Sequence, residues 1–144
     1  IGTLRYRYNL SKRITSHLLQ LKEVLYLTMS NVSEELFLKA AEIIGDKDIK
    51  PQKASGIGEK LRLYGLYKRG TVGKLSPPYD ADDTDTDKRP TSRPGMLKFD
   101  ARQKYDAWAA CDSMSKQEAR DAYVKLAEEL VGKPLTDAIE AATK

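Results

Sequence analysis

The sequence predicts an all-α fold: a four-helix bundle with an added helix at the N-terminus and a short helix at the C-terminus. Apolar residues recur at helical spacing in several segments, helix start and stop signals flank these segments, and no strand pattern appears. The 144 residues suit one domain of ordinary size. Such a domain buries roughly two-thirds of the surface that its unfolded chain exposes.

The first helix of the bundle is expected directly after Ser33, which is a good N-cap. Glu34 and Glu35 would then lie in the first turn, where acidic side chains interact favourably with the helix dipole. Gly45 is expected to close the helix. Its apolar face would consist of Leu36, Phe37, Ala40, Ala41, Ile43 and Ile44.

A second helix is expected over about residues 59–70, after a loop at 46–58 that proline and glycine residues mark. Gly65 lies in the middle of this helix, where glycine is less favourable than alanine by about 1 kcal/mol. This cost indicates that close packing or a ligand requires a glycine there.

A long loop at 73–95 follows, and within it residues 74–92 form an acidic, proline-rich insertion. Its aspartates are Asp80, Asp82, Asp83, Asp85 and Asp87. The run resembles a calcium-binding loop, but glycine at the sixth position and glutamate at the twelfth are missing in every register. We therefore expect no metal site here, and a solvated, mobile insertion.

Two more helices complete the predicted bundle. One is expected to follow Asp100, with Tyr105 and Trp108 three residues apart on one face. The other begins with a capping box, in which Ser115 is the N-cap and Glu118 the third helical residue. The predicted core of this helix is rich in alanine and leucine.

The C-terminal boundaries follow from glycine and proline. The last bundle helix is expected to end at Gly132, and Pro134 then begins a tail helix at 135–142. The predicted segments are a basic N-terminal extension at 1–32, a helical domain at 33–132 and a C-terminal tail helix at 133–144.

The N-terminal extension carries five basic residues and one acid, Glu23, which leaves equal numbers of basic and acidic residues in 33–144. Residues 11–29 have amphipathic spacing, and three interpretations stay open for them. They form a targeting segment, a helix added to the core or to a partner, or sequence upstream of a natural start at Met29. We favour the last two.

Composition excludes several functions. A single cysteine excludes a disulfide framework and indicates a cytoplasmic protein. One cysteine and one histidine cannot build a zinc site, and neither Cys111 nor His17 has a recognisable catalytic context. We therefore expect no enzyme activity, metal or cofactor. The neutral folded part also argues against a nucleic-acid-binding domain.

Tyrosines and lysines are the candidate binding residues. Tyr64, Tyr67 and Lys68 share one helix face, on which Lys104 and Tyr123 could converge. Aromatic rings stack on nucleobases, and phenol and ammonium groups donate to phosphate oxygens. The pattern indicates a phosphorylated, aromatic ligand with an apolar part. A buried tyrosine stripe with lysines reaching to solvent is the alternative that spacing alone leaves open.

Four stretches carry a family resemblance. They are SEELFLKAAEII (33–44), KLRLYGLYKRGTVG (60–73), RPGMLKFDARQKYDAW (93–108) and SKQEARDAYVKLAEEL (115–130). On these stretches residues 33–131 resemble the acyl-CoA-binding protein family. The resemblance implies a four-helix bundle that binds long-chain fatty acyl-CoA thioesters without turnover, as an intracellular carrier or buffer in lipid metabolism.

The resemblance also implies roles for the candidate residues. Tyr64, Tyr67 and Lys68 would contact the adenine and the phosphates. Lys104 would pair with the ribose 3′-phosphate, and Tyr123 would close the nucleotide side of the site.

Further family positions fall on apolar residues. Gly65 and Leu66 lie between the ligating residues of the second helix. Ala41, Leu61 and Leu63 would line the groove for the acyl chain, whereas Trp108 is interpreted as core.

The sequence departs from the family at several positions. Family members often have a lysine where this chain has Gly45, and another where it has Asp100, so two phosphate contacts are absent. Arg69 offers a spare cation beside Lys68. Acidic residues of the insertion would repel the ligand if they folded over a phosphate site.

The expected partners are acyl-CoA thioesters, with transient contacts to membranes or acyl-CoA-using enzymes. We expect a monomer that binds no nucleic acid. The alternative is a basic helical module that binds nucleic acid or an anionic membrane surface through residues 1–32.

Overall fold

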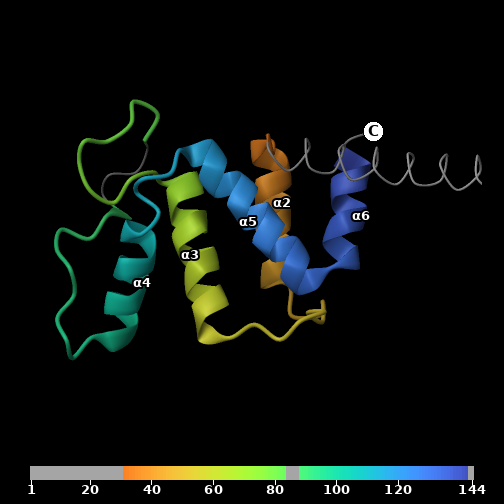
Figure 1. Cartoon of the computed structure of the whole chain (residues 1–144), viewed down its shortest axis with the longest axis horizontal. Helices are drawn as coiled ribbons and strands as arrows, with labels where there is room; N and C mark the ends of the chain where they lie inside the picture. Colours follow the sequence, from red (N-terminus) through yellow and green to blue (C-terminus); the bar gives the residue numbers. More distant parts are fainter. Residues whose placement is uncertain (1–30, 84–87, 143–144) are drawn as a thin grey trace, which may run out of the picture. The chain divides into compact units, whose positions relative to one another are not determined.

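The computed structural model describes residues 31–83 and 88–142, which form five helices and no strand (Figure 1). The predicted all-α class is therefore confirmed for this part of the chain. The interpretations of residues 1–30, including the added N-terminal helix, lie outside the described residues. The helices are α2 (Glu34–Gly45), α3 (Ile57–Thr71), α4 (Phe99–Ala109), α5 (Lys116–Val131) and α6 (Lys133–Ala142).

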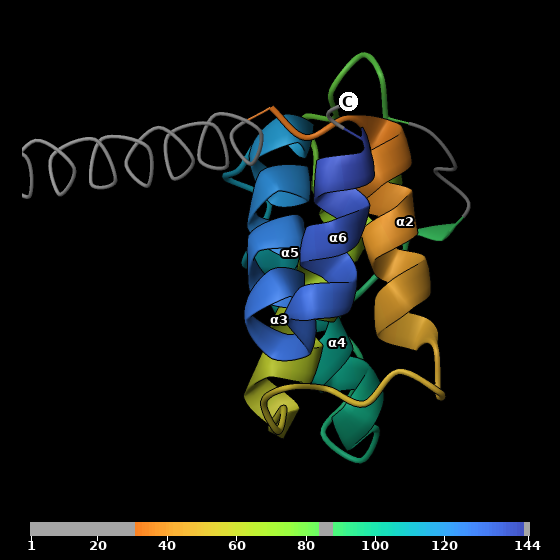
Figure 2. The same ribbon diagram turned by 90° about the vertical axis from the view of Figure 1, so that its right-hand side faces the viewer.

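The order of the helices in space differs from their order along the chain. α3 packs against both α4 and α5, while α2 packs against α5 and α6. Figures 1 and 2 show that α4 lies on the side of α3 that faces away from α5. Because α3 is its main helical neighbour, α4 depends on α3 and on the adjoining loops for its position. Over the described residues, no helix combines the length and apolar character that a bilayer crossing requires.

The predicted helix starts agree with the structure at the two helices that have a side-chain N-cap. The Ser33 hydroxyl accepts a hydrogen bond from the backbone N–H of Leu36 at 3.2 Å. The capping box is complete, because Ser115 Oγ accepts from Glu118 N at 3.0 Å and the Glu118 carboxylate accepts from Ser115 N at 2.8 Å. α3 and α4 each begin about two residues earlier than predicted, and neither has a capping side chain.

Trp108 belongs to the core, as predicted. It is 2% exposed and packs with Val72 and Leu75, against which Tyr105 also lies. Its indole Nε1 donates to the carbonyl of Gly73 at 2.9 Å. This cluster joins the end of α3 to α4.

Gly65 allows α3 and α4 to approach each other closely. A Cβ atom at this position would lie 2.2 Å from the carbonyl oxygen of Ala107 and 3.2 Å from Cys111 Sγ. Real Cβ atoms essentially never come within 3.0 Å of backbone atoms. Of the two reasons that the sequence allowed for this glycine, the structure supports close packing.

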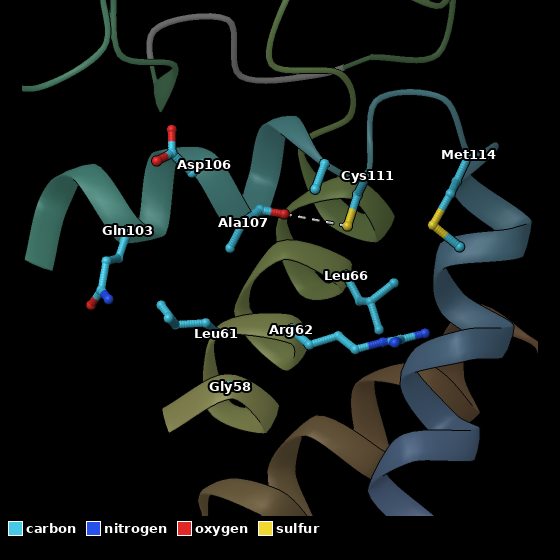
Figure 3. Close-up of a pocket in the computed structure, with 10 residues that line it drawn as sticks. Gly58, Leu61, Arg62, Leu66, Gln103, Asp106, Ala107, Cys111 and Met114 are labelled. Carbon is cyan, nitrogen blue, oxygen red and sulfur yellow. Dashed lines mark hydrogen bonds between the residues drawn. The ribbon is translucent and has the colours of Figure 1, made fainter. Parts of the chain in front are cut away.

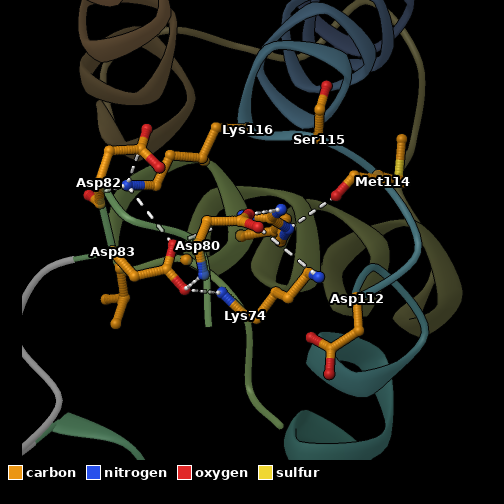
Figure 4. A network of polar contacts seen from close by, with 12 residues as sticks. Lys74, Asp80, Asp82, Asp83, Asp112, Met114, Ser115 and Lys116 are labelled. Carbon is orange, nitrogen blue, oxygen red and sulfur yellow. Dashed lines mark hydrogen bonds and ion pairs between the residues drawn. The ribbon is translucent and has the colours of Figure 1, made fainter. Parts of the chain in front are cut away.

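Most described residues of the acidic insertion are exposed, but buried contacts anchor the insertion to the domain. The Asp83 carboxylate is 1% exposed and accepts from the backbone N–H groups of Lys74 and Asp80, each at 3.1 Å (Figure 4). It also accepts from Arg89 Nη2 at 3.1 Å. Gly73 makes room for it, since its φ is +114° and a Cβ atom there would lie 2.0 Å from Asp83 Oδ1. The sequence pattern does not reveal this anchoring, because it depends on tertiary contacts of Asp83. Asp85 and Asp87 lie outside the described residues.

Arg69 is also not the spare cation that the sequence suggested. Its side chain is 1% exposed, its Nη2 donates to Asp80 at 2.6 Å, and its Nε donates to the carbonyl of Met114 at 2.8 Å. The Arg69 hydrogen bond holds the pKa of Asp80 below its usual range. Arg69 therefore fixes the insertion to the core and is not available to a ligand.

Oxygens of Asp80, Asp82 and Asp83 lie within 4.8 Å of one another, but basic groups accompany them. Lys116 Nζ is 3.5 Å from Asp82 and 3.7 Å from Asp83, and Lys74 Nζ is 3.6 Å from Asp80 (Figure 4). These carboxylates therefore serve ion pairs that hold the loop.

Candidate functional site

Two lysines from different helices place their ammonium groups near the ring of Tyr64. Lys68, one turn further along α3, places its ammonium nitrogen 6.0 Å from the centre of the Tyr64 ring. Lys104 on α4 places its ammonium nitrogen 5.6 Å from the same centre. The tyrosine is half-buried, and this burial raises its pKa. The structure thus brings together three of the predicted nucleotide-binding residues.

A pocket of about 360 Å³ opens beside Tyr64 and Lys104, and we call it the Tyr64 pocket. Three of its residues are basic, and none of its described lining residues is acidic. It is lined by Tyr64, Lys88, Arg89, Pro90, Pro94, Ala101, Lys104, Tyr105 and Trp108. Aromatic rings and cations therefore surround one cavity, a combination that suits a planar anionic group.

The other two predicted tyrosines meet in an aromatic cluster on the α2 and α5 side of α3. The ring centres of Tyr67 and Tyr123 are 6.2 Å apart, and Phe37 lies 5.8 Å from Tyr67 and 5.2 Å from Tyr123. Tyr123 is 4% exposed, and burial raises its pKa to about 12. Tyr67, at 37% exposed, offers its phenol to solvent. Tyr123 therefore supports Tyr67 from within the core.

A second, larger pocket of about 550 Å³ lies between α3 and α4, and we call it the apolar pocket (Figure 3). Leu61 and Leu66 line it from α3, while Ala107 and Cys111 come from α4 and the turn after it. Its remaining lining residues are Gly58, Arg62, Gln103, Asp106, Ala110 and Met114. The cavity has apolar walls and some polar lining residues, and it can hold a hydrocarbon group.

The predicted groove residues fall in different surroundings. Leu61 lines the apolar pocket and is half-buried. Leu63 is 7% exposed and belongs to the core. Ala41 is half-buried on α2, and neither Ala41 nor Leu63 lines either of the two pockets described here.

Sequence reasoning missed Arg89 and Lys88, which the insertion brings to the Tyr64 pocket. The signal available in the sequence is the Lys-Arg pair that follows the acidic run. This pair is not predicted as a ligand contact, because the whole insertion is expected to be solvated. The repulsion considered above does not arise from the described aspartates, since Asp80, Asp82 and Asp83 are ion-paired and do not line this pocket.

Among the described residues that line the two pockets, none resembles an activated nucleophile. Cys111 borders the apolar pocket, but it is 7% exposed and burial raises the pKa of its thiol. Catalytic cysteines instead have a lowered pKa next to a cation or a helix N-terminus. The thiol therefore acts as a small apolar side chain here.

Comparison with known proteins places this geometry in a family. The family model described as "Acyl CoA binding protein" matches residues 34–127. An "Acyl-CoA-binding protein" of Ricinus communis is 38% identical over 79 residues, which are 55% of this chain and 72% of that protein. An "Acyl-CoA-binding protein homolog 1" of Caenorhabditis elegans is 40% identical over 75 residues, which are 52% of this chain and 71% of that protein.

A solved structure, that of Oryza sativa Acyl-CoA-Binding Protein 2, aligns with 77% of this chain and 98% of its own at 32% identity and a TM-score of 0.49. The family match covers well over half of the chain and includes α2, α3, α4 and most of α5. The chain belongs to the acyl-CoA-binding protein family.

Proposed function

We propose that this protein binds long-chain fatty acyl-CoA thioesters reversibly and serves as an acyl-CoA carrier or buffer inside the cell. Membership of the family supports acyl-CoA binding. The observation that carries the proposal is the proximity of Lys68 and Lys104 to the ring of Tyr64, at a pocket where all charged lining residues among those described are basic.

The basic and aromatic lining of the Tyr64 pocket suits the nucleotide end of CoA. Adenine is flat and stacks on tyrosine, while each phosphate requires cationic donors. We assign the contacts with the adenine and the phosphates jointly to Tyr64, Tyr67 and Lys68, with Tyr67 outside the Tyr64 pocket, and the ribose 3′-phosphate to Lys104. Tyr123 acts indirectly, since it is buried behind Tyr67.

The acyl chain requires an apolar surface. Leu61 is near both parts of the proposed site. It precedes Tyr64 by three residues on α3 and lines the apolar pocket. Each buried methylene contributes about 0.8 kcal/mol, so affinity should rise with chain length until the groove is full. Ala41 and Leu63 do not line the apolar pocket, so the proposed groove does not include them.

A carrier needs release instead of chemistry. The raised pKa of the Cys111 thiol supports a non-catalytic role, because the thiol stays protonated near neutral pH. We propose that the bound thioester leaves unchanged, without a cofactor or metal. The alternative of a nucleic-acid module rests on residues 1–32, which lie almost wholly outside the described part of the chain.

An exposed apolar tip before α4 supports transient contact with membranes. Met96, Leu97 and Phe99 are 81%, 101% and 63% exposed. Lys98 and Arg102 lie beside them in the sequence. Apolar side chains that enter the acyl boundary while cations meet anionic headgroups are typical of peripheral membrane contacts. Such contact would let the carrier collect and deliver its ligand.

Trp108 offers a direct test, because it is the single tryptophan and lines the Tyr64 pocket. Titrating the full chain with hexadecanoyl-CoA should change its fluorescence saturably, and a thiol assay on the same sample should detect no free CoA. Released CoA would contradict the carrier proposal, and an unchanged spectrum together with no binding in equilibrium dialysis would contradict ligand binding.

Lys104→Ala tests the assignment of the phosphate. The variant should bind hexadecanoyl-CoA more weakly by about 1.5–3 kcal/mol, the range for hydrogen bonds to charged groups. The loss should nearly vanish for the 3′-dephospho ester, because that ester lacks the partner of Lys104. Lys133→Ala is the control, since Lys133 is an exposed lysine on α6 that pairs with Asp137. Equal losses for both esters would refute the assignment.

A further inference from the structure

We propose that Arg89, which the insertion supplies, is an additional anion-binding residue of the Tyr64 pocket and pairs there with the ribose 3′-phosphate of the ligand. The inference rests on the proposed function. It assigns to residues 74–92 a part in ligand specificity.

The Arg89 side chain is held in place by the body of the domain. It is 4% exposed, and its Nη2 donates to the carbonyl of Val72 at 3.3 Å and to Asp83 at 3.1 Å. Its Nε donates to the carbonyl of Lys74. The Tyr79 ring lies with its centre 4.4 Å from the guanidinium carbon. A cation fixed in this way loses little conformational entropy when it binds an anion.

One guanidinium nitrogen of Arg89 makes no hydrogen bond to the described residues. Arg89 Nη1 is buried and has no hydrogen-bond partner among the described residues. In native proteins the great majority of buried polar atoms are hydrogen-bonded. A buried charged donor without a hydrogen bond lowers the stability of the fold more than a neutral one does. Nη1 is closed to solvent in this structure, but Arg89 lines the Tyr64 pocket together with Lys104. A small shift of the guanidinium would let a phosphate bound next to both residues supply the missing acceptor.

The charge around the pocket favours an anion. Its three charged lining residues, Lys88, Arg89 and Lys104, are basic. The negative charge of Asp83 is shared among Arg89 and two other cations, since its other oxygen lies 3.9 Å from Arg69 Nη1 and 3.7 Å from Lys116 Nζ. Arg69 also has an unpaired Nη1, but that atom faces Asp83 and Arg69 does not line the pocket. Of these two buried arginines, only Arg89 lines the Tyr64 pocket.

The test must separate anion binding from a purely structural role, because Arg89 also holds the insertion. Arg89→Gln and Arg89→Lys are compared with wild type for hexadecanoyl-CoA and its 3′-dephospho ester. Arg93→Gln is the matched control, since Arg93 lies four residues further along and pairs on the surface with Asp106 at 2.7 Å.

We expect Arg89→Gln to weaken binding of hexadecanoyl-CoA about 10-fold or more and binding of the dephospho ester less than about 3-fold. Arg89→Lys should recover part of the difference between the two esters, whereas Arg93→Gln should leave it unchanged. Losses of the same factor for both esters, or no loss, would overturn the inference and leave Arg89 a structural residue. A wild type that binds neither ester would instead refute the proposed function.

A measurement on the wild type covers the case in which the variants do not fold. The guanidinium ¹⁵N resonances of Arg89 should shift when adenosine 3′,5′-bisphosphate is added and should hardly shift with adenosine 5′-phosphate. Equal shifts with both nucleotides, or none with either, would overturn the inference.

Discussion

Replacing Gly65 by alanine tests the close contact between α3 and α4, on which the position of Lys104 depends. The new methyl group would lie 2.2 Å from the Ala107 carbonyl oxygen and 2.7 Å from its carbonyl carbon. These are backbone atoms, so no side-chain rotation can relieve the overlap. α4 must move away from α3.

Two opposing effects set the magnitude. Alanine is favoured over glycine inside a helix by about 1 kcal/mol. Overpacking typically costs about 1–3 kcal/mol, and a clash with backbone belongs at the upper end of that range. We expect Gly65→Ala to lower the free energy of unfolding by about 1–2 kcal/mol. Displacement of α4 should also separate Lys104 from Tyr64 and weaken acyl-CoA binding.

The assay is urea unfolding followed by the fluorescence of Trp108, which is buried between the end of α3 and α4. Gly58→Ala is the matched control on the same helix, because no atom lies within 4 Å of the position that its new methyl group would take. That variant should be as stable as wild type or more stable by up to about 1 kcal/mol. A Gly65→Ala protein as stable as Gly58→Ala would refute the close approach of the two helices.

Three further predictions concern stability. Trp108→Ala should lower the free energy of unfolding by about 3–5 kcal/mol, and a melting curve like that of wild type would place Trp108 at the surface. Ser115→Ala removes the capping box and should cost about 1 kcal/mol in urea unfolding, so an unchanged midpoint would show that the cap contributes nothing. Tyr123 has a pKa of about 12 when folded and 10.0 as its ordinary value, so the unfolded chain ionises first. Wild type should therefore lose about 2–3 kcal/mol more than Tyr123→Phe as pH rises from about 10 to 12, and parallel stability curves would contradict this.

The parts of the fold that were predictable depend on local chemistry. Ser33 and the Ser115 capping box mark helix starts because a side chain bonds to backbone within three residues. The insertion was not predictable in this way, since Asp83 contacts Arg89 and the buried Arg69 of α3. Ion pairs between segments leave no periodic pattern in a sequence.

The same difference between local and tertiary contacts applies to the candidate site. Tyr64 and Lys68 share a helix face, so their proximity follows from the helical period. The approach of Lys104 required the family resemblance, because α4 meets α3 only through tertiary packing. Arg89 escaped prediction because its side chain is oriented by Val72, Lys74 and Asp83, whose contacts with it only the folded chain creates.

Calorimetry with a series of acyl-CoA esters tests the central claim most directly. We expect affinity to rise with acyl-chain length up to a plateau. Hexadecanoyl-CoA should bind far more tightly than CoA or hexadecanoic acid alone, because the two ends of the ligand are bound by different parts of the site. Binding of hexadecanoyl-CoA no tighter than that of CoA would contradict the account.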